Sequence, residues 1–334
     1  MNEEITINDV AREAAVSVST VSRVLNGRDR VSPATKKRVL KVAERLNYTP
    51  NSFAVSMIKK KSNMIAVVVP DILNPFYTAV IKGVESIVKK HGYFTFVSST
   101  DDNYKEEADL LKGSFTKSID GLILIGSHKE ASFYQSISKD VVLVDRYQEK
   151  ANLDGVVIDN YGGAYSAIEH GINYGHKKIA IINGLLDFND GQDRFKGYKD
   201  AIEDHGIEFN SDYHIQGSWQ EENGYNAAKK LLSMSTPPTL IFATNNLICE
   251  GVIAACRDME IILGKDISLI GFDENKFSEF IRPEVTVVRR PTFEMGTTAA
   301  RLLLEKFDEE QHETRKITLG VELVKRGSVK NLND

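Results

Sequence analysis

Short apolar runs rich in β-branched residues alternate with helix-like segments along most of this 334-residue chain. Continuous apolar runs of four to seven residues are typical of strands buried on both faces of a parallel sheet, and such strands need crossover helices, as the pattern over 79–91 indicates. The runs occupy residues 64–70, 94–97, 121–125 and 141–144, and again 178–182, 239–243 and 267–272. Two series of βα units predict two doubly wound α/β lobes.

Residues 6–46 predict three short helices instead. The first, over 6–15, opens with a capping candidate and keeps its apolar residues three and four apart, on one face. Ser17 can cap a second helix over 18–25, and Ser32 followed by proline begins a third that runs to about Leu46. Two short helices joined by a tight turn and supported by a third predict a helix-turn-helix. An ordinary three-helix bundle is the alternative.

The second of these helices carries the side chains that a groove-reading helix needs. It buries Val21, Val24 and Leu25, and it leaves outward Val18, Ser19, Ser22 and Arg23. Residues 1–62 contain 12 Lys and Arg against 6 Asp and Glu, whereas the rest of the chain holds 30 against 41. A basic head on an acidic body predicts a polyanionic partner for the head, with a chance excess of solvated lysines as the alternative.

The segment from Thr6 to Gly27 resembles the opening of the lac repressor (LacI/GalR) family of bacterial transcription regulators, and the similarity covers the whole chain. The resemblance implies that Val18, Ser19 and Arg23 read bases, while Thr20 and Ser22 suit phosphate contact. Ala15 stands where the family usually has glycine, so its turn either needs no positive φ or bears a small strain. The expected DNA-binding set is Thr6, Ser17, Val18, Ser19, Thr20, Ser22, Arg23, Asn26, Asn51, Ala54 and Met57.

The segment after Pro50 is too short to form a stable isolated helix in water. Asn51 can cap it, and three lysines end it. By the same resemblance it is a hinge helix that pairs across a dimer and wedges an apolar side chain between base steps. Met57 stands where the family usually has leucine, and Val55 where an arginine is common. Because methionine is still apolar enough to insert between base steps, we expect the DNA to be kinked, and we expect Val55 to alter the affinity for the operator. A flexible basic linker is the alternative.

Polar and aromatic side chains follow the predicted strands of both lobes, where ligands of such sheets bind. Carboxylates, amides and guanidinium groups with aromatic plates suit a polyhydroxyl ring. This body resembles the periplasmic sugar-binding fold, which implies an effector site of Asn74, Phe76, Tyr77, Asp145, Arg146, Arg194, Trp219, Asn245, Asp273 and Arg289. Arg289 stands where ribose binders tend to have glutamine, which favours an anionic or phosphorylated ligand. Many family members have aspartate at the position of Asn246, so the resemblance gives less support to an effector-binding role for this residue.

The expected domains are a helix-turn-helix head over 1–50, a hinge helix or linker over 51–62, and an effector-binding domain over 63–330. Such bodies cross between lobes three times, so we expect an N-lobe of about 63–161 and 291–321 and a C-lobe of about 162–290 and 322–330. Cys249 and Cys256, seven apart on a predicted helix, are too distant to bridge and predict buried thiols in a reducing compartment. Without a signal peptide or a membrane-length apolar run, we expect a cytoplasmic protein with no membrane partner.

The leading hypothesis is a homodimeric repressor of carbohydrate-utilisation genes that binds palindromic operator DNA. A sugar, sugar phosphate or nucleoside in the cleft between the lobes would control it. A catabolite-control-type regulator governed by a partner phosphoprotein is the alternative. A transport-type sugar receptor and an enzyme are less consistent with the basic head and with the absence of nucleotide, nucleophile and metal motifs. We therefore expect no catalytic residue, no cofactor and no metal, and a dimer rather than a tetramer.

Overall fold

The computed structural model describes residues 5–25, 31–48, 61–274, 281–308 and 312–333. The chain forms two compact units, Met1–Asn63 and Met64–Asp334, which are described separately below as the head and the body. The expected hinge and four predicted DNA contacts lie outside the described residues: Asn26, Asn51, Ala54 and Met57.

The head holds three helices, which match the prediction closely: α1 (Ile7–Glu13), α2 (Val18–Leu25) and α3 (Pro33–Arg45). The Thr6 backbone N–H and hydroxyl both donate to the Asp9 carboxylate at the start of α1. The Ser32 side chain accepts from the Thr35 N–H at the start of α3. Apolar residues of all three helices form one small core, which includes Val10, Ala14, Val21, Val24, Val39 and Val42. These contacts make the three helices one packed unit.

The turn between α1 and α2 depends on a left-handed residue. Ala15 has a φ of 50°, and the next residue, Val16, donates its N–H back to the Ala11 carbonyl. Of the two expectations for this position, the structure therefore selects the strained one. A left-handed alanine brings its Cβ close to the backbone and costs about 1 kcal/mol relative to glycine.

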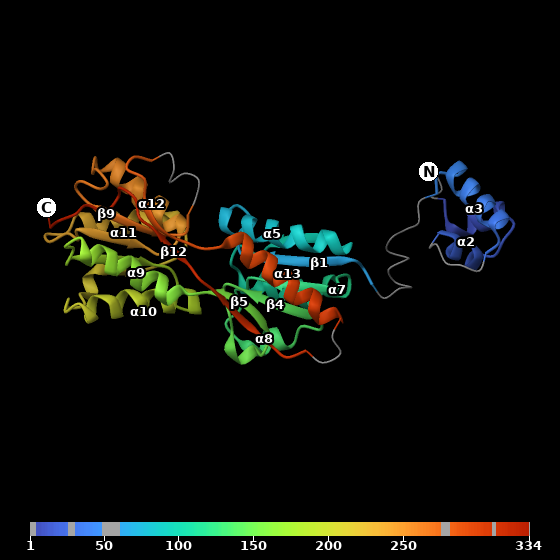
Figure 1. The fold of residues 1–334 in the computed structure, drawn as a ribbon, viewed down its shortest axis with the longest axis horizontal. Coiled ribbons are helices and arrows are strands. Elements are labelled where there is room, and N and C mark those ends of the chain that lie inside the picture. Colours follow the sequence, from blue (N-terminus) through green and yellow to red (C-terminus); the bar gives the residue numbers. More distant parts are fainter. Residues whose placement is uncertain (1–4, 26–30, 49–60, 275–280, 309–311, 334) are drawn as a thin grey trace. The chain divides into compact units, whose positions relative to one another are not determined.

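The first lobe of the body is a six-stranded parallel sheet in the order β11-β5-β4-β3-β1-β2 (Figure 1). Its strands are β1 (Met64–Val69), β2 (Phe94–Ser99), β3 (Gly121–Leu124), β4 (Asp140–Val144), β5 (Asp154–Ile158) and β11 (Lys316–Leu319). Two helices, α5 (Pro75–Val88) and α13 (Thr292–Asp308), pack against each other on one face. The other face is covered by α6 (Tyr104–Lys112), α7 (Ser114–Lys117) and α8 (Ala131–Gln135).

The second lobe repeats this design in the order β12-β10-β9-β8-β6-β7. Its strands are β6 (Ile179–Asn183), β7 (His214–Gln216), β8 (Leu240–Ala243), β9 (Ser268–Phe272), β10 (Thr286–Arg289) and β12 (Glu322–Val324), which runs antiparallel to β10. One face packs against α9 (Asn160–Asn173) and α10 (Asn189–Asp204), and the other against α11 (Glu221–Leu232) and α12 (Asn246–Asp258). Short 3₁₀ turns lie at Lys89–His91, Glu149–Ala151 and Ser211–Tyr213.

The chain passes between the lobes after β5, after β10 and after β11. The crossing after β5 falls between Ile158, where β5 ends, and Asn160, where α9 begins in the second lobe. The end of the chain also packs there beyond residue 330, where the Leu332 N–H donates to the Tyr174 carbonyl. Cys249 and Cys256 are both buried on α12 as free thiols. In the described part of the chain, no helix has the length and apolar character needed to cross a bilayer.

We predict that Ala15→Gly stabilises the head by about 1 kcal/mol, because glycine adopts the left-handed conformation without the Cβ clash. Hydrogen exchange of α1–α3 amides in the full chain measures this as slower local opening. Ala14→Gly is the matched control: Ala14 is buried in the right-handed region, so glycine there should speed exchange. Equal effects of the two substitutions would contradict a strained Ala15.

Candidate functional site

The outward face of α2 is the candidate DNA-contact surface of the head. Val21 and Val24 face the core, whereas Val18, Ser19 and Arg23 are exposed and Ser22 is half-buried. The Ser17 hydroxyl accepts from the Thr20 N–H at 3.2 Å and lies 2.8 Å from the hydroxyls of Ser19 and Thr20. Thr6 is exposed at the start of α1. A helix N-terminus surrounded by hydroxyl groups suits a phosphate oxygen.

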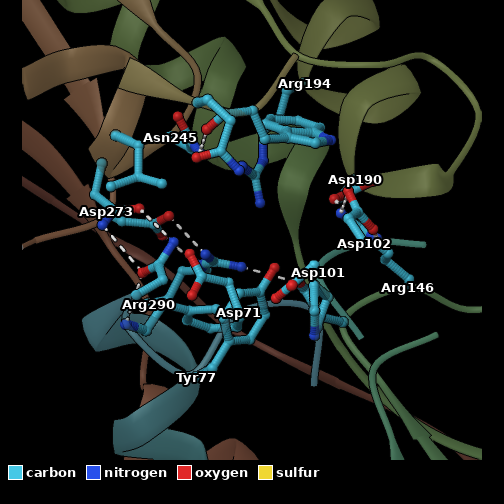
Figure 2. A pocket seen from close by; sticks show the side chains of 18 residues that line it. Asp71, Tyr77, Asp101, Asp102, Arg146, Asp190, Arg194, Asn245, Asp273 and Arg290 are labelled. Carbon is cyan, nitrogen blue, oxygen red and sulfur yellow. Dashed lines mark hydrogen bonds and ion pairs between the residues drawn. The ribbon is translucent and has the colours of Figure 1, made fainter. Parts of the chain in front are cut away.

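The body contains a cavity of about 240 Å³ that residues of both lobes line (Figure 2). Nine of the ten predicted effector residues line it: Asn74, Phe76, Tyr77, Asp145, Arg146, Arg194, Trp219, Asn245 and Asp273. The tenth, Arg289, does not. The cavity is also lined by polar residues outside the predicted set: Asp71, Asp101, Asp102, Asp190, Gln220, Asn246 and Arg290. Asp71 and the pair Asp101-Asp102 follow strands β1 and β2, so strand-end position could have found them, whereas Asp190 lies inside α10.

Arg289, which was expected in the effector site, lies outside the cavity, and the neighbouring Arg290, for which no role was expected, lines it. Arg289 ends β10 opposite Glu322 of β12, and its partly exposed side chain pairs with Glu274 and Glu322. The next residue, Arg290, lies past the strand end and enters the cavity, where it pairs with Asp145 and Asp273. Successive side chains of an extended segment point to opposite sides, so a shift of one residue exchanges the two arginines. The arginine in the cavity is thus Arg290, and because Asp145 and Asp273 already pair with its guanidinium, it offers no unpaired charge to an anionic ligand.

Arg146 lies in the wall of the cavity with a chain of partners behind it. Its guanidinium pairs with Asp102, lies 3.8 Å from the Asp190 carboxylate, and stacks over Phe188 with its centre 5.0 Å from the ring centroid. The Ser127 hydroxyl donates to Asp102 at 2.9 Å, and the Ser127 N–H donates to Glu107. This chain of partners holds the guanidinium in one position.

Arg194 is the third buried arginine of the cavity, and its partners are neutral. Its Nε donates to the Asn160 side chain at 2.8 Å and one terminal nitrogen to the Thr244 carbonyl at 2.6 Å. The guanidinium lies 3.9 Å from the Phe272 ring centroid, and its other terminal nitrogen is buried without a hydrogen-bond partner in the described residues. Burial, followed by the Arg290 charge, lowers the pKa of Arg194. Figure 2 shows this side chain pointing into the cavity.

The cavity buries as many aspartates as arginines, although burial raises the pKa of one aspartate, Asp190. Arg146, Arg194 and Arg290 are at most 7% exposed, and so are Asp145, Asp190 and Asp273. The remaining lining carboxylates, Asp71, Asp101 and Asp102, are partly or fully exposed. A ligand that carried negative charge into this cavity would meet carboxylates at its rim and no surplus of buried positive charge. The arrangement therefore suits an uncharged, hydroxyl-rich molecule.

The amide side chains act mainly within the protein. Asn74 caps α5 by accepting the Phe76 N–H, and it exchanges hydrogen bonds of 3.1 and 3.4 Å with Asn246 of the other lobe. Asn245 caps α12 through the Ile248 N–H and donates to the Trp219 carbonyl at 2.9 Å. The Trp219 indole N–H is buried without a described partner. Asn245 thus holds the backbone of Trp219, whose indole N–H, like one terminal nitrogen of Arg194, is a buried donor without a partner among the described residues.

No cluster of side chains suited to a metal ion occurs in the ranges that the structure describes. His176 packs at the far side of the second lobe, within 3.0 Å of the Thr239 hydroxyl and the Lys330 carbonyl.

We predict that Glu107→Gln removes a pH dependence of stability. Burial raises the pKa of Glu107 from 4.5 to about 7, against the backbone N–H groups of Ser127 and His128. Because the folded protein binds this proton more tightly than the unfolded chain, the resulting stability is fully present below about pH 4.5 and is lost as the pH rises through about 7. Between about pH 4.5 and pH 7, the free energy of unfolding of the variant should therefore rise relative to that of the wild type by up to about 3 kcal/mol.

Urea unfolding at pH 5 and pH 8 measures this difference. Glu106→Gln, at the exposed neighbouring position, is the control and should follow the wild type. Parallel pH profiles of Glu107→Gln and the wild type would contradict a buried, protonated Glu107.

Comparisons with known proteins agree with this architecture. Residues 6–51 match the family described as bacterial regulatory proteins, lacI family, and residues 168–329 match a periplasmic binding protein-like domain. Catabolite control protein A of Priestia megaterium is 34% identical over 331 residues, with 98% of this chain and 99% of the relative covered. The transcriptional regulator CelR in complex with cellobiose shares 27% identity at a TM-score of 0.73, over 97% of this chain and 99% of that one.

The lac repressor dimer bound to operator has a TM-score of 0.85 at 22% identity, over 98% of this chain and 100% of that one, and so shares the fold. The helix-turn-helix head, the two parallel-sheet lobes and the end-to-end match with regulators lead to one conclusion: this chain belongs to the LacI family of bacterial regulatory proteins.

Proposed function

We propose that this protein is a homodimeric transcriptional repressor that binds a palindromic operator and responds to a small, uncharged carbohydrate-like or nucleoside effector in the body cavity. It acts in the cytoplasm and catalyses no reaction. The observation that carries the proposal is the combination of an outward polar face on α2 with a cavity that buries as many aspartates as arginines and presents unpartnered N–H donors.

The DNA-binding part rests on the packing of α2. Val21 and Val24 anchor the helix in the head core, so the exposed side chains Val18, Ser19 and Arg23 project away from it. A small head gains affinity and specificity by pairing on a two-fold operator, which favours a dimer. The relative with the same fold, the lac repressor, is a dimer on its operator.

The effector part rests on the cavity. The free Arg194 nitrogen and the Trp219 indole N–H are buried donors that a ligand hydroxyl or carbonyl oxygen would satisfy. CelR, with which the chain shares 27% identity, is described in complex with cellobiose. An effector that binds one arrangement of the lobes more tightly shifts the protein toward it, and operator and effector must then alter each other's affinity by the same factor. A partner phosphoprotein as effector remains the alternative.

We predict that Arg23→Ala weakens binding to the selected operator by about 1–3 kcal/mol and relaxes the preference at one base position. Selection from a randomised duplex library with the full chain identifies the operator, and fluorescence anisotropy at constant salt measures affinity. Arg45→Ala, on the exposed end of α3, is the control for a simple loss of charge. Equal losses on operator and scrambled duplex would instead assign Arg23 to phosphate contact.

We predict that Arg194→Gln reduces the affinity of the effector at least about tenfold, because glutamine cannot keep both internal bonds and also reach the ligand. Pentoses, hexoses, nucleosides and their phosphates are screened by thermal shift, in which a bound ligand raises the melting temperature by mass action. Each variant is compared with its own ligand-free state, and Lys199→Gln on the outer side of α10 is the control. A screen in which no compound shifts the wild type would favour the phosphoprotein alternative.

A further inference from the structure

The Arg290 guanidinium forms a charged contact with both lobes at the centre of the cavity. Arg290 lies between β10 of the second lobe and α13 of the first, at one of the three crossings. Two of its nitrogens, Nε and one terminal nitrogen, donate to the two carboxylate oxygens of Asp273, which follows β9 in the second lobe. The other terminal nitrogen donates at 2.8 Å to Asp145, which follows β4 in the first lobe. One side chain thus connects the two sheets.

The two carboxylates are held in equivalent places. In the repeated strand order, β4 and β9 occupy the same position, and the residue after each is an aspartate in the left-handed region, with φ of 65° at Asp145 and 73° at Asp273. Each aspartate donates its own N–H to the neighbouring strand, to Val156 and Val288 respectively, at 2.9 Å. Such backbone conformations persist only where the surroundings impose them. The fold therefore presents a fixed carboxylate from each lobe to a single cation.

The Arg290 guanidinium also stacks on the aromatic ring of Phe76, which lines the cavity. Its centre lies 3.7 Å from the ring centroid of Phe76, which is the distance of direct stacking. A sugar ring that used Phe76 as a platform and the two aspartates as hydroxyl acceptors would occupy the space that Arg290 fills. Burial alone would lower the pKa of Arg290, but Asp273 and Asp145 raise it, so the group remains charged.

We propose that Arg290 is an internal ligand of the cavity: its guanidinium occupies the place of a bound effector between Asp145, Asp273 and Phe76, and it holds the two lobes together in the absence of any small molecule. A bidentate, buried guanidinium–carboxylate contact is among the stronger polar interactions in proteins, and loss of one partner leaves a buried charge uncompensated. Arg146 of the first lobe also faces a carboxylate of the second lobe, Asp190, but at the longer distance of 3.8 Å. Two further inter-lobe contacts are weaker in kind. Lys129 pairs with Asp187 on the exposed surface, and Asn74 with Asn246 through neutral amides.

The place assigned to the effector rests on the proposed function, whereas the contact between the lobes can be tested without DNA or an effector. The distance between the lobes can be measured in the full chain with spin labels at Lys105→Cys and Glu222→Cys, exposed positions on α6 and α11. These helices follow the equivalent edge strands β2 and β7. The native thiols do not compete for label, because burial raises the pKa of Cys249 to about 12 and that of Cys256 to about 11.

With Arg290 present, the label pair should give one narrow distance distribution without added ligand. Arg290→Ala should shift the ratio of the short to the long distance at least about tenfold toward the long one, which corresponds to 1.4 kcal/mol. Arg289→Gln is the matched control: it removes the adjacent arginine, whose partners Glu274 and Glu322 lie outside the cavity, and should leave the distribution unchanged.

Chemical rescue separates the guanidinium group from a general effect of the substitution. Millimolar 1-ethylguanidinium, added to Arg290→Ala, should restore the short distance, whereas ethylurea, which is neutral and of the same shape, should not. If Arg290→Ala fails to fold, it is replaced by the triple variant Asp145→Asn, Asp273→Asn, Arg290→Met, in which all three side chains are uncharged. This variant should likewise show the long distance. The proposal is overturned if either variant keeps the wild-type distribution, or if ethylguanidinium and ethylurea act alike.

Discussion

Burial of three guanidinium groups beside three carboxylates, where the strand ends of two sheets meet, is the constraint on which the rest of the body depends. Each charge would be strongly destabilising alone, so the lobes must present their partners at fixed positions. The parallel sheets meet this requirement because every strand of a lobe except the antiparallel β12 delivers its carboxyl end to the same edge. Arg146 pairs with Asp102 of the first lobe and lies 3.8 Å from Asp190 of the second. Arg194 is held within the second lobe, and Arg290 lies between the two lobes.

This arrangement connects recognition to conformation. Donors that the protein leaves unpartnered, on Arg194 and Trp219, are places where a ligand oxygen would replace a missing hydrogen bond. The Arg290 bridge instead satisfies its own charges without a ligand. An effector that binds Asp145 and Asp273 has to displace Arg290 from them. Its affinity therefore depends on the free energy of its own contacts minus that of the Arg290 contacts that it replaces.

Much of the fold was predictable from local pattern. The three head helices and all seven predicted strands have the expected positions, because capping residues and continuous apolar runs are local signals. The expected burial of β2 was wrong, because β2 lies at the edge of its sheet and leaves Phe94 and Phe96 exposed. Five strands were not predicted: β7, β11 and β12 lie at sheet edges and are partly exposed, while β5 and β10 begin with polar residues. Helix α5 begins at Pro75, before the predicted start at 79, because Asn74 caps it.

The sequence by itself determined which residue types face the cavity, since nine of ten predicted side chains follow strand ends or occupy helix faces that turn toward it. Only the tertiary structure decided which of two adjacent arginines enters. The end of β10 and its pairing with β12 direct Arg289 to Glu322, and the crossing that follows directs Arg290 to carboxylates far apart in the chain. The same holds for Asp190 and for the left-handed turn at Ala15. Local pattern carries helix and strand identity, whereas side-chain direction at an element's end depends on contacts that are distant in sequence.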